Sequence, residues 1–279
     1  MESFAATVYV ITDEILKILN IQEDEQALMS NAEVMTFAIL AAKYFHGNFK
    51  MARYICKKIQ LFPFILSNSR LNRRIHAIQW NCWQATFRFL SFIFMQSNEN
   101  HYFAVDSFPV ICCQKNRIDK RKLFPARGYL GFAASKKRYF CGIKVHMLVT
   151  CDGKPIEIHF KPGSIADVNV LWEMELNIPG DSIIYADGAY NSFDLEDVLK
   201  EEGIQLLAKR GIRAKQRTRS ASKEKEISSR RQIIETAFSC ITNLFPRYLK
   251  VRTEAGFMIK VMYAVLAYCT SFLCRSSLA

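Results

Sequence analysis

Residues 138–161 read RYFCGIKVHMLVTCDGKPIEIHFK, and two runs within this stretch decide the fold class. The runs, 138–150 and 154–161, are rich in the β-branched and aromatic residues that favour strands. Asp152-Gly153 lies between them, and an Asp-Gly pair flanked by such runs is a strong signal for a tight turn. The stretch therefore predicts a β-hairpin.

Shorter runs of the same kind surround the hairpin and alternate with a helical pattern. Residues 101–106 (HYFAVD) and 182–186 (SIIYA) predict two strands, each of which ends at an aspartate. A helix is predicted over 193–202 and a further strand over 204–208. Strands followed by alternating helices and strands are typical of an α/β or α+β domain.

The first part of the chain has helical rather than strand-like periodicity. The predicted helices cover 34–45, 50–60 and 68–94. Asn31 is the expected N-cap of the first of them. The polar run SNEN at 97–100 interrupts the helical pattern. We therefore expect an N-terminal helical region over 1–97 and a second domain over 98–279.

The end of the chain contains a basic stretch and two further helical patterns. Residues 209–229 lack apolar periodicity and are rich in Lys and Arg, so we predict an exposed, mobile basic loop there. Helices are predicted over 230–245 and about 256–274. Lys260 interrupts the second of these, so we expect no membrane span.

The chain is basic, but its charge is unevenly distributed. It has 279 residues, with 38 Lys and Arg against 26 Asp and Glu, and a formal net charge of +12. Residues 107–147 carry ten basic side chains and one acidic one, whereas 148–208 carry three basic and twelve acidic. Residues 209–231 return to ten basic and two acidic. Two basic segments with an acidic segment between them suit a protein that binds a polyanion next to a metal site. Solvated surface charge is the simpler alternative.

Composition excludes several classes of protein. Half of the residues are hydrophobic, and there are only 11 Gly and 7 Pro, which excludes a disordered or collagen-like chain. The first 33 residues carry seven acids and one lysine, unlike an export signal. The nine cysteines are therefore expected to be reduced thiols. We therefore expect a cytoplasmic protein.

Three acids stand out by position: Asp106 and Asp187 end predicted strands, and Glu235 lies at the border of the buried face of a predicted helix. Carboxylates on rigid elements can hold two Mg²⁺ ions about 3.5–4 Å apart for phosphoryl transfer. Taken alone, an Asp at a strand end also fits a turn or cap, and Glu235 fits an ion pair with Arg231. The residues themselves leave both interpretations open.

Five stretches in combination are more specific. They are SRLNRRIHAI at 69–78, VDSFPVICC at 105–113, GYLGFAASKKRYFCGIKVHML at 128–148, YADGAY at 185–190 and SRRQIIETAFSCITNLF at 229–245. Together they resemble the DDE transposases of the insertion-sequence 982 family. The resemblance runs almost from end to end. It implies a ribonuclease-H-like mixed sheet with flanking helices, preceded by a helical DNA-binding region.

The resemblance also implies an activity. Asp106, Asp187 and Glu235 would be the catalytic triad that binds two Mg²⁺ ions, for which Mn²⁺ can substitute. The implied reaction is metal-dependent cleavage and strand transfer of double-stranded DNA at the ends of an insertion sequence, by a homodimer. Ser228 and Thr242 stand where the related signature has Tyr and Lys, so the roles of those two positions do not carry over.

Basic residues in and around these stretches are the expected contacts to DNA. They are Arg70, Arg73, Arg74, Lys136, Lys137, Arg138, Lys144, His146, Arg210, Arg213, Lys215, Arg217, Arg219 and Arg231. For His146 on its own, a packed or hydrogen-bonded histidine is the simpler interpretation.

Two rival functions stay open at this stage. One is a catalytically inactive DNA-binding derivative of a transposase, in which the three acids are relics. The other is a sugar hydrolase with a carboxylate pair, which the net charge of +12 disfavours because neutral glycans require no such field. Neither G-x-S-x-G nor a P-loop motif is present, so serine hydrolysis and ATP use are not indicated.

Overall fold

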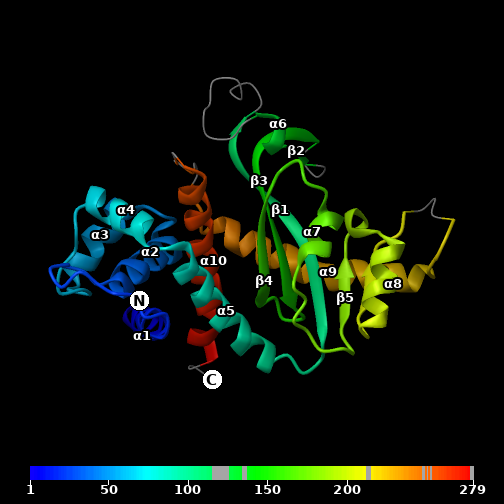
Figure 1. The fold of residues 1–279 in the computed structure, drawn as a ribbon, viewed down its shortest axis with the longest axis horizontal. Coiled ribbons are helices and arrows are strands. Elements are labelled where there is room, and N and C mark those ends of the chain that lie inside the picture. The colour runs from blue at the N-terminus through cyan, green and yellow to red at the C-terminus, as the bar shows by residue number, and fades with distance from the viewer. Residues whose placement is uncertain are drawn as a thin grey trace. The chain divides into compact units, whose positions relative to one another are not determined.

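The hairpin forms as predicted and lies within a mixed sheet. In the computed structural model the strands are β1 (Tyr102–Gln114), β2 (Leu130–Ala133), β3 (Arg138–Thr150), β4 (Pro155–Pro162), β5 (Ile183–Ala186) and β6 (Gln205–Ala208). Their order is β2-β3-β1-β5-β6, and β4 also pairs with β3 (Figure 1). Pairs β1–β3, β2–β3 and β3–β4 are antiparallel, whereas β1–β5 and β5–β6 are parallel. The predicted mixed α/β class is confirmed.

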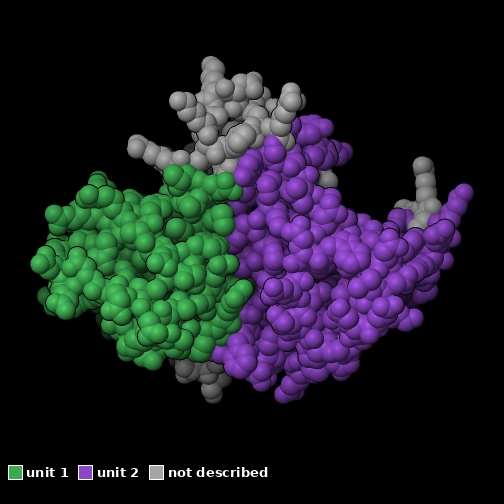
Figure 2. All heavy atoms as spheres, viewed as in Figure 1, with its two compact units in different colours: residues 1–90, 239–279 green, residues 91–238 purple. Residues whose placement is uncertain are grey.

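The structure describes residues 1–114, 126–133, 137–211, 215–246, 249, 251 and 253–276. They divide into two units, one formed by 1–90 with 239–279 and the other by 91–238 (Figure 2). The predicted division into 1–97 and 98–279 therefore differs from the structure, because the C-terminal helix belongs to the N-terminal unit.

The unit formed by 1–90 and 239–279 is helical. Its helices are α1 (Glu2–Ile18), α2 (Asn31–Phe45), α3 (Phe49–Lys58), α4 (Asn68–Ala77), the start of α5 (Trp80–Gln96), the end of α9 (Ala221–Asn243) and α10 (Glu254–Ser276). Ser30 rather than Asn31 caps α2, in a capping box with Glu33. The predicted helix over 68–94 is two helices, because Ile78 has an extended backbone and a buried side chain.

Helix α10 joins this unit because it is apolar around most of its circumference, as is α2. Lys43 donates a hydrogen bond to Ser271 at 2.6 Å, and the rings of Phe49 and Tyr263 lie 6.2 Å apart. The stretch Glu254–Cys274 is long and apolar enough to span a membrane, but 67% of its most apolar window is buried inside the protein. Length and composition alone are therefore weak evidence for a span.

The second unit contains the sheet, and short helices follow its strands. These are α6 (Ala126–Tyr129), α7 (Asp167–Glu173), a 3₁₀ turn (Gly188–Tyr190) and α8 (Phe193–Glu201). In the hairpin turn, Gly153 has a φ of 82°, a left-handed conformation that glycine adopts without strain. The turn therefore has the residue that its backbone requires.

Helix α9 (Ala221–Asn243) begins nine residues before the predicted start at 230, so the predicted loop over 209–229 is wrong for 221–229. The Ser220 hydroxyl accepts a hydrogen bond from the Lys223 N–H at the beginning of the helix. In the charged first turns Ile227 is buried, and it packs with Tyr185 and Leu207. One apolar residue was too weak a periodic signal to predict this part of the helix.

Candidate active site

The register of the sheet brings two of the predicted acids together. Strands β1 and β5 pair in parallel up to Val105 and Ala186. Asp106 is the next residue of β1, and Asp187 directly follows the end of the neighbouring strand β5. Strand β1 was predicted to end at 106, but it continues to 114 because it also pairs with β3. Asp106 thus lies within a strand, where its backbone is held firmly.

Helix α9 supplies the third acid. The rings of Phe108 and Phe238 lie 4.7 Å apart, so α9 packs on the face of β1 that also carries Asp106. One turn of this helix separates Arg231 from Glu235. Both side chains can therefore lie beside the strand ends.

The guanidinium of Arg231 contacts all three acids. Its Nη2 lies 2.6 Å from Asp106 Oδ2 and 3.9 Å from Glu235 Oε1, and its Nη1 lies 3.6 Å from Asp187 Oδ1. We call these four residues the carboxylate cluster. The structure thus brings together three acids that are far apart in the sequence.

The acids of the cluster differ in exposure. The side chains of Asp106, Asp187 and Glu235 are 16%, 46% and 62% exposed. Burial raises the pKa of the Asp106 carboxyl above its usual value, while Arg231 and the Ser107 N–H oppose that shift. Asp187 accepts a hydrogen bond from the Gly188 N–H at 2.6 Å, so its turn is also ordered locally.

The donor set fits a hard divalent cation. All three side chains offer carboxylate oxygens, which Mg²⁺ prefers, and all three already converge on one positive group. Among the described residues, no three His, Cys, Asp or Glu side chains form a ready-made metal site. Here the acids converge on the guanidinium of Arg231 instead. Asp106, Asp187 and Glu235 are therefore the residues that could hold a metal.

Comparison with known proteins identifies the family. A family model described as a transposase DDE domain matches residues 96–246. The chain belongs to the DDE transposase family. No curated sequence matches it. The assignment to the insertion-sequence 982 family remains a prediction.

One similar solved structure extends the comparison from sequence to fold. It is a cryo-EM structure of the piggyBac transposase synaptic complex with hairpin DNA, at a TM-score of 0.51 and 10% identity. The similarity covers 99% of this chain and 73% of the other. At this identity the likeness shows the fold alone, and it agrees with a ribonuclease-H-like sheet.

On the opposite face of β1, the DDE transposase domain has a buried polar network. Ser107 on β1 lies opposite His146 on β3, and His146 Nδ1 lies 3.2 Å from the Tyr190 hydroxyl. Lys144 forms an ion pair with Asp167 at 2.8 Å. Ser107, Tyr190 and Asp167 were not among the predicted site residues. The VDSFPVICC and YADGAY stretches contain Ser107 and Tyr190, whereas none of the five stretches contains Asp167.

His146 was predicted to contact DNA, and the structure places its side chain fully buried in the interior. Burial, and after it the positive charge of Lys144, lowers the pKa of His146 to about 3, so the ring is neutral. The Lys144 side chain is only 15% exposed and is already paired with Asp167. In this structure both side chains belong to the buried polar network of the DDE domain.

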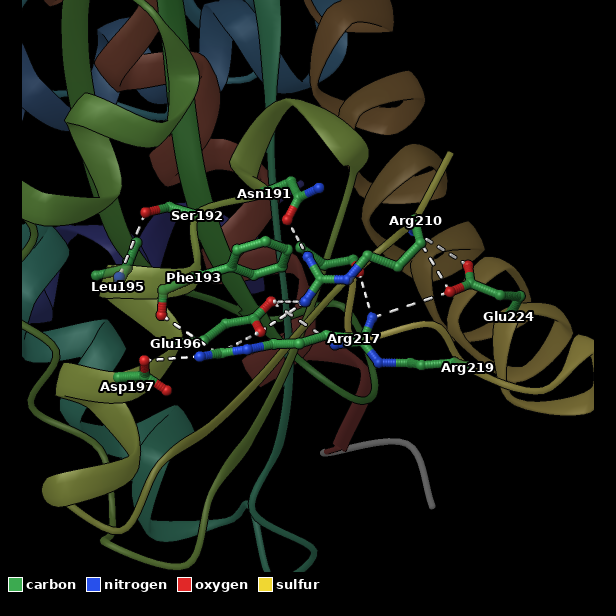
Figure 3. Close-up of polar contacts among 11 residues, drawn as sticks. Asn191, Ser192, Phe193, Leu195, Glu196, Asp197, Arg210, Arg217, Arg219 and Glu224 are labelled. Carbon is green, nitrogen blue, oxygen red and sulfur yellow. Dashed lines mark hydrogen bonds and ion pairs between the residues drawn. The ribbon is translucent and has the colours of Figure 1, made fainter. Parts of the chain in front are cut away.

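A second ionic cluster holds the segment that follows β6 (Figure 3). It contains three of the arginines predicted to bind DNA and three acids, and we call it the arginine clamp. Its members are Arg210, Arg217, Arg219, Glu196, Asp197 and Glu224. Glu196 is the hub, because all three arginines lie within 4.0 Å of its carboxylate.

Arg210 is the most buried member of the clamp. It donates to Glu196 at 2.6 Å and to Asn191, and its guanidinium carbon lies 4.8 Å from the centre of the Phe193 ring. Arg217 lies at the same distance from that ring and pairs with Asp197 at 2.7 Å. The DNA contact by Arg210 stays a prediction, and in this structure its charge is buried and compensated by Glu196.

The other predicted DNA contacts have varied positions. Exposed side chains are Arg70, Arg73, Lys137, Arg138 and Lys215. Arg74 donates a hydrogen bond to Asn31 at 3.0 Å. Lys136 and Arg213 lie outside the described residues. Ser228 and Thr242, which replace the Tyr and Lys of the related signature, both lie on α9.

Proposed function

We propose that the chain is a metal-dependent transposase that cuts DNA at the ends of an insertion sequence and joins those ends to a target. The observation that carries this proposal is the convergence of Asp106, Asp187 and Glu235 on one cationic side chain. Membership of the DDE family supports it. The neighbouring structure, a transposase complex with hairpin DNA, supports DNA as the partner.

In this proposal the three carboxylates hold Mg²⁺, with Mn²⁺ as a substitute, and two ions are expected. The chemistry that the metal supplies when bound is activation of the nucleophile and stabilisation of charge on the phosphate. Asp106 and Asp187 act from adjacent strands, so the protein fixes their separation through the sheet. Arg231 leaves the carboxylates and becomes available to a DNA phosphate.

Water and then a DNA 3′-hydroxyl act as nucleophiles, so no covalent protein intermediate is needed. The exposed cations of the chain hold the DNA backbone, among them Arg70 and Arg73 on α4 and Lys137 and Arg138 beside β3. Binding should therefore weaken steeply as salt is raised. We also propose a homodimer, because two element ends must be brought together, and a cytoplasmic location.

The test is cleavage of DNA that carries the element ends. With Mg²⁺ or Mn²⁺ the purified chain should cut this DNA, and Asp187→Asn should abolish cutting while DNA binding survives. Asp187 is 46% exposed, so its replacement should leave the fold intact. The matched control is Asp194→Asn, an exposed carboxylate in the first turn of α8, which should cut normally.

Undiminished cleavage by Asp187→Asn would remove this residue from the metal site. A wild-type chain that binds the ends but cuts nothing with either metal would favour the catalytically inactive derivative.

A further inference from the structure

Asp106 and Asp187 are linked on the side of the sheet away from Arg231. Ser107 follows Asp106, and because side chains alternate along a strand it points to the opposite face. Tyr190 ends the 3₁₀ turn that Asp187 caps, and its side chain is fully buried. The hydroxyl of Ser107 lies next to that of Tyr190. A polar contact thus joins the segments that carry the two acids.

His146 completes this contact. It lies opposite Ser107 in the ladder of β1 and β3, and its Nδ1 is 3.2 Å from the Tyr190 hydroxyl. Burial keeps the imidazole neutral and also raises the pKa of Tyr190, so the phenol retains its proton. The Tyr190 O–H therefore donates to Nδ1, which leaves the ring proton on Nε2.

The far side of the imidazole faces a charged pair. His146 Nε2 lies 3.9 Å from Asp167 Oδ1, and Asp167 also accepts from Lys144 at 2.8 Å and from Ser107 at 3.3 Å. Lys144 stands two residues before His146 on β3, so both side chains project from the same face. The carboxylate favours the tautomer in which Nε2 carries the proton.

We propose that Tyr190 and His146 are positioning residues that hold the turn bearing Asp187 at a fixed distance from Asp106. The inference rests on the proposed metal-dependent function. The ladder between β1 and β5 ends at Ala186, so Asp187 has no partner on β1. The Tyr190 side chain connects its turn back to β1 and β3. Two like charges repel each other, and this tie resists their separation.

The test measures metal affinity rather than activity. Mn²⁺ binding to the full chain is followed by the loss of the free-ion signal in electron paramagnetic resonance. Tyr190→Phe removes one hydroxyl and keeps the ring. We expect it to weaken Mn²⁺ binding about 10-fold, as is typical when a group that orients a metal ligand is lost.

Tyr185→Phe is the matched control. Tyr185 is also buried, lies on β5 two residues before Asp187, and donates one hydrogen bond to Glu226 at 2.9 Å. It should lose stability much as Tyr190→Phe does, yet bind Mn²⁺ as the wild type does. Equal weakening in both variants would overturn the proposal, because it would reflect general loosening of the fold.

Variants of His146 provide a rescue test. His146→Leu removes the acceptor for Tyr190 and should weaken Mn²⁺ binding as Tyr190→Phe does. The amide oxygen of His146→Asn can lie near the position of Nδ1, so this variant should recover part of the affinity. An unchanged Mn²⁺ affinity in Tyr190→Phe, beside an Asp187→Asn variant that binds poorly, would overturn the positioning role alone. A wild-type chain that binds no Mn²⁺ would overturn both this role and the proposed metal site.

Discussion

The carboxylate cluster and the arginine clamp contain the same types of side chain but differ in charge balance. The carboxylate cluster sets three acids against one guanidinium. The arginine clamp sets three acids against three guanidinium groups. Formal charges therefore cancel in the clamp, whereas the carboxylate cluster retains excess negative charge that a further cation can neutralise.

The two clusters also differ in what they hold. The clamp joins α8 to the segment between β6 and α9, through Glu196 and the buried Arg210. The carboxylate cluster joins two strand ends to α9 and leaves Asp187 and Glu235 largely accessible. In a balanced, buried cluster the loss of one partner leaves an uncompensated charge, whereas an unbalanced and open cluster suits ligand binding. A dense run of arginines does not by itself distinguish these cases.

The largest effect on stability should come from the hub of the clamp. Glu196→Gln removes the carboxylate that faces Arg210, whose side chain is 3% exposed. An uncompensated buried charge should lower the free energy of unfolding by about 3 kcal/mol, measured by urea denaturation. Glu175→Gln, which replaces an exposed glutamate of the same unit, is the matched control. A loss no greater than that of the control would show that the clamp is not structural.

A smaller and pH-dependent effect should follow from Arg231→Gln in the carboxylate cluster. Burial raises the pKa of Asp106 in the folded state, so ionising it costs stability as pH rises through that pKa. Arg231 opposes the shift, and its loss should raise the pKa of Asp106 further. The variant should therefore be less stable than the wild type at about pH 7, with a smaller difference at about pH 4.

A metal ion should reduce the difference in stability between Arg231→Gln and the wild type. Added Mn²⁺ takes over the charge compensation and should raise the melting temperature of Arg231→Gln more than that of the wild type. A difference in stability that is independent of pH, with no extra response to Mn²⁺, would contradict this account of the cluster.

Local signals predicted five strands of the sheet, but they missed β2 and the second half of β1. Strand β3 has the predicted bounds, because its β-prone residues and the Asp-Gly turn act over short distances. The start of α9 was missed, since only Ile227 marks its buried face and that burial depends on Tyr185 and Leu207. The place of α10 could not be predicted either, because it depends on packing with α2 across most of the sequence.

The site residues also differ in whether local sequence or packing between distant segments determines their positions. Asp106, Asp187 and Glu235 were predicted from their positions and from the family resemblance. The sheet register brings the two aspartates together, and the packing of α9 adds Glu235. The burial of Arg210 was not predicted, and for His146 a packed histidine was only the alternative to a DNA contact. Their partners, Tyr190 and Glu196, meet them only through the pairing of strands and the packing of α8. Charge runs in a sequence identify cations but not their compensating acids.

The smallest effect should come from the exposed edge of the clamp, where Asp197→Asn breaks the ion pair with Arg217. The two side chains are 57% and 42% exposed, so water and salt screen their attraction. We expect no change in the denaturation midpoint beyond experimental error. Glu196→Gln acts on the same clamp. Comparison of the two variants therefore shows whether the loss of stability depends on burial of the ion pair or on the number of ion pairs lost. A large loss in Asp197→Asn would mean that the network acts as one unit, in which exposed and buried partners are equally important.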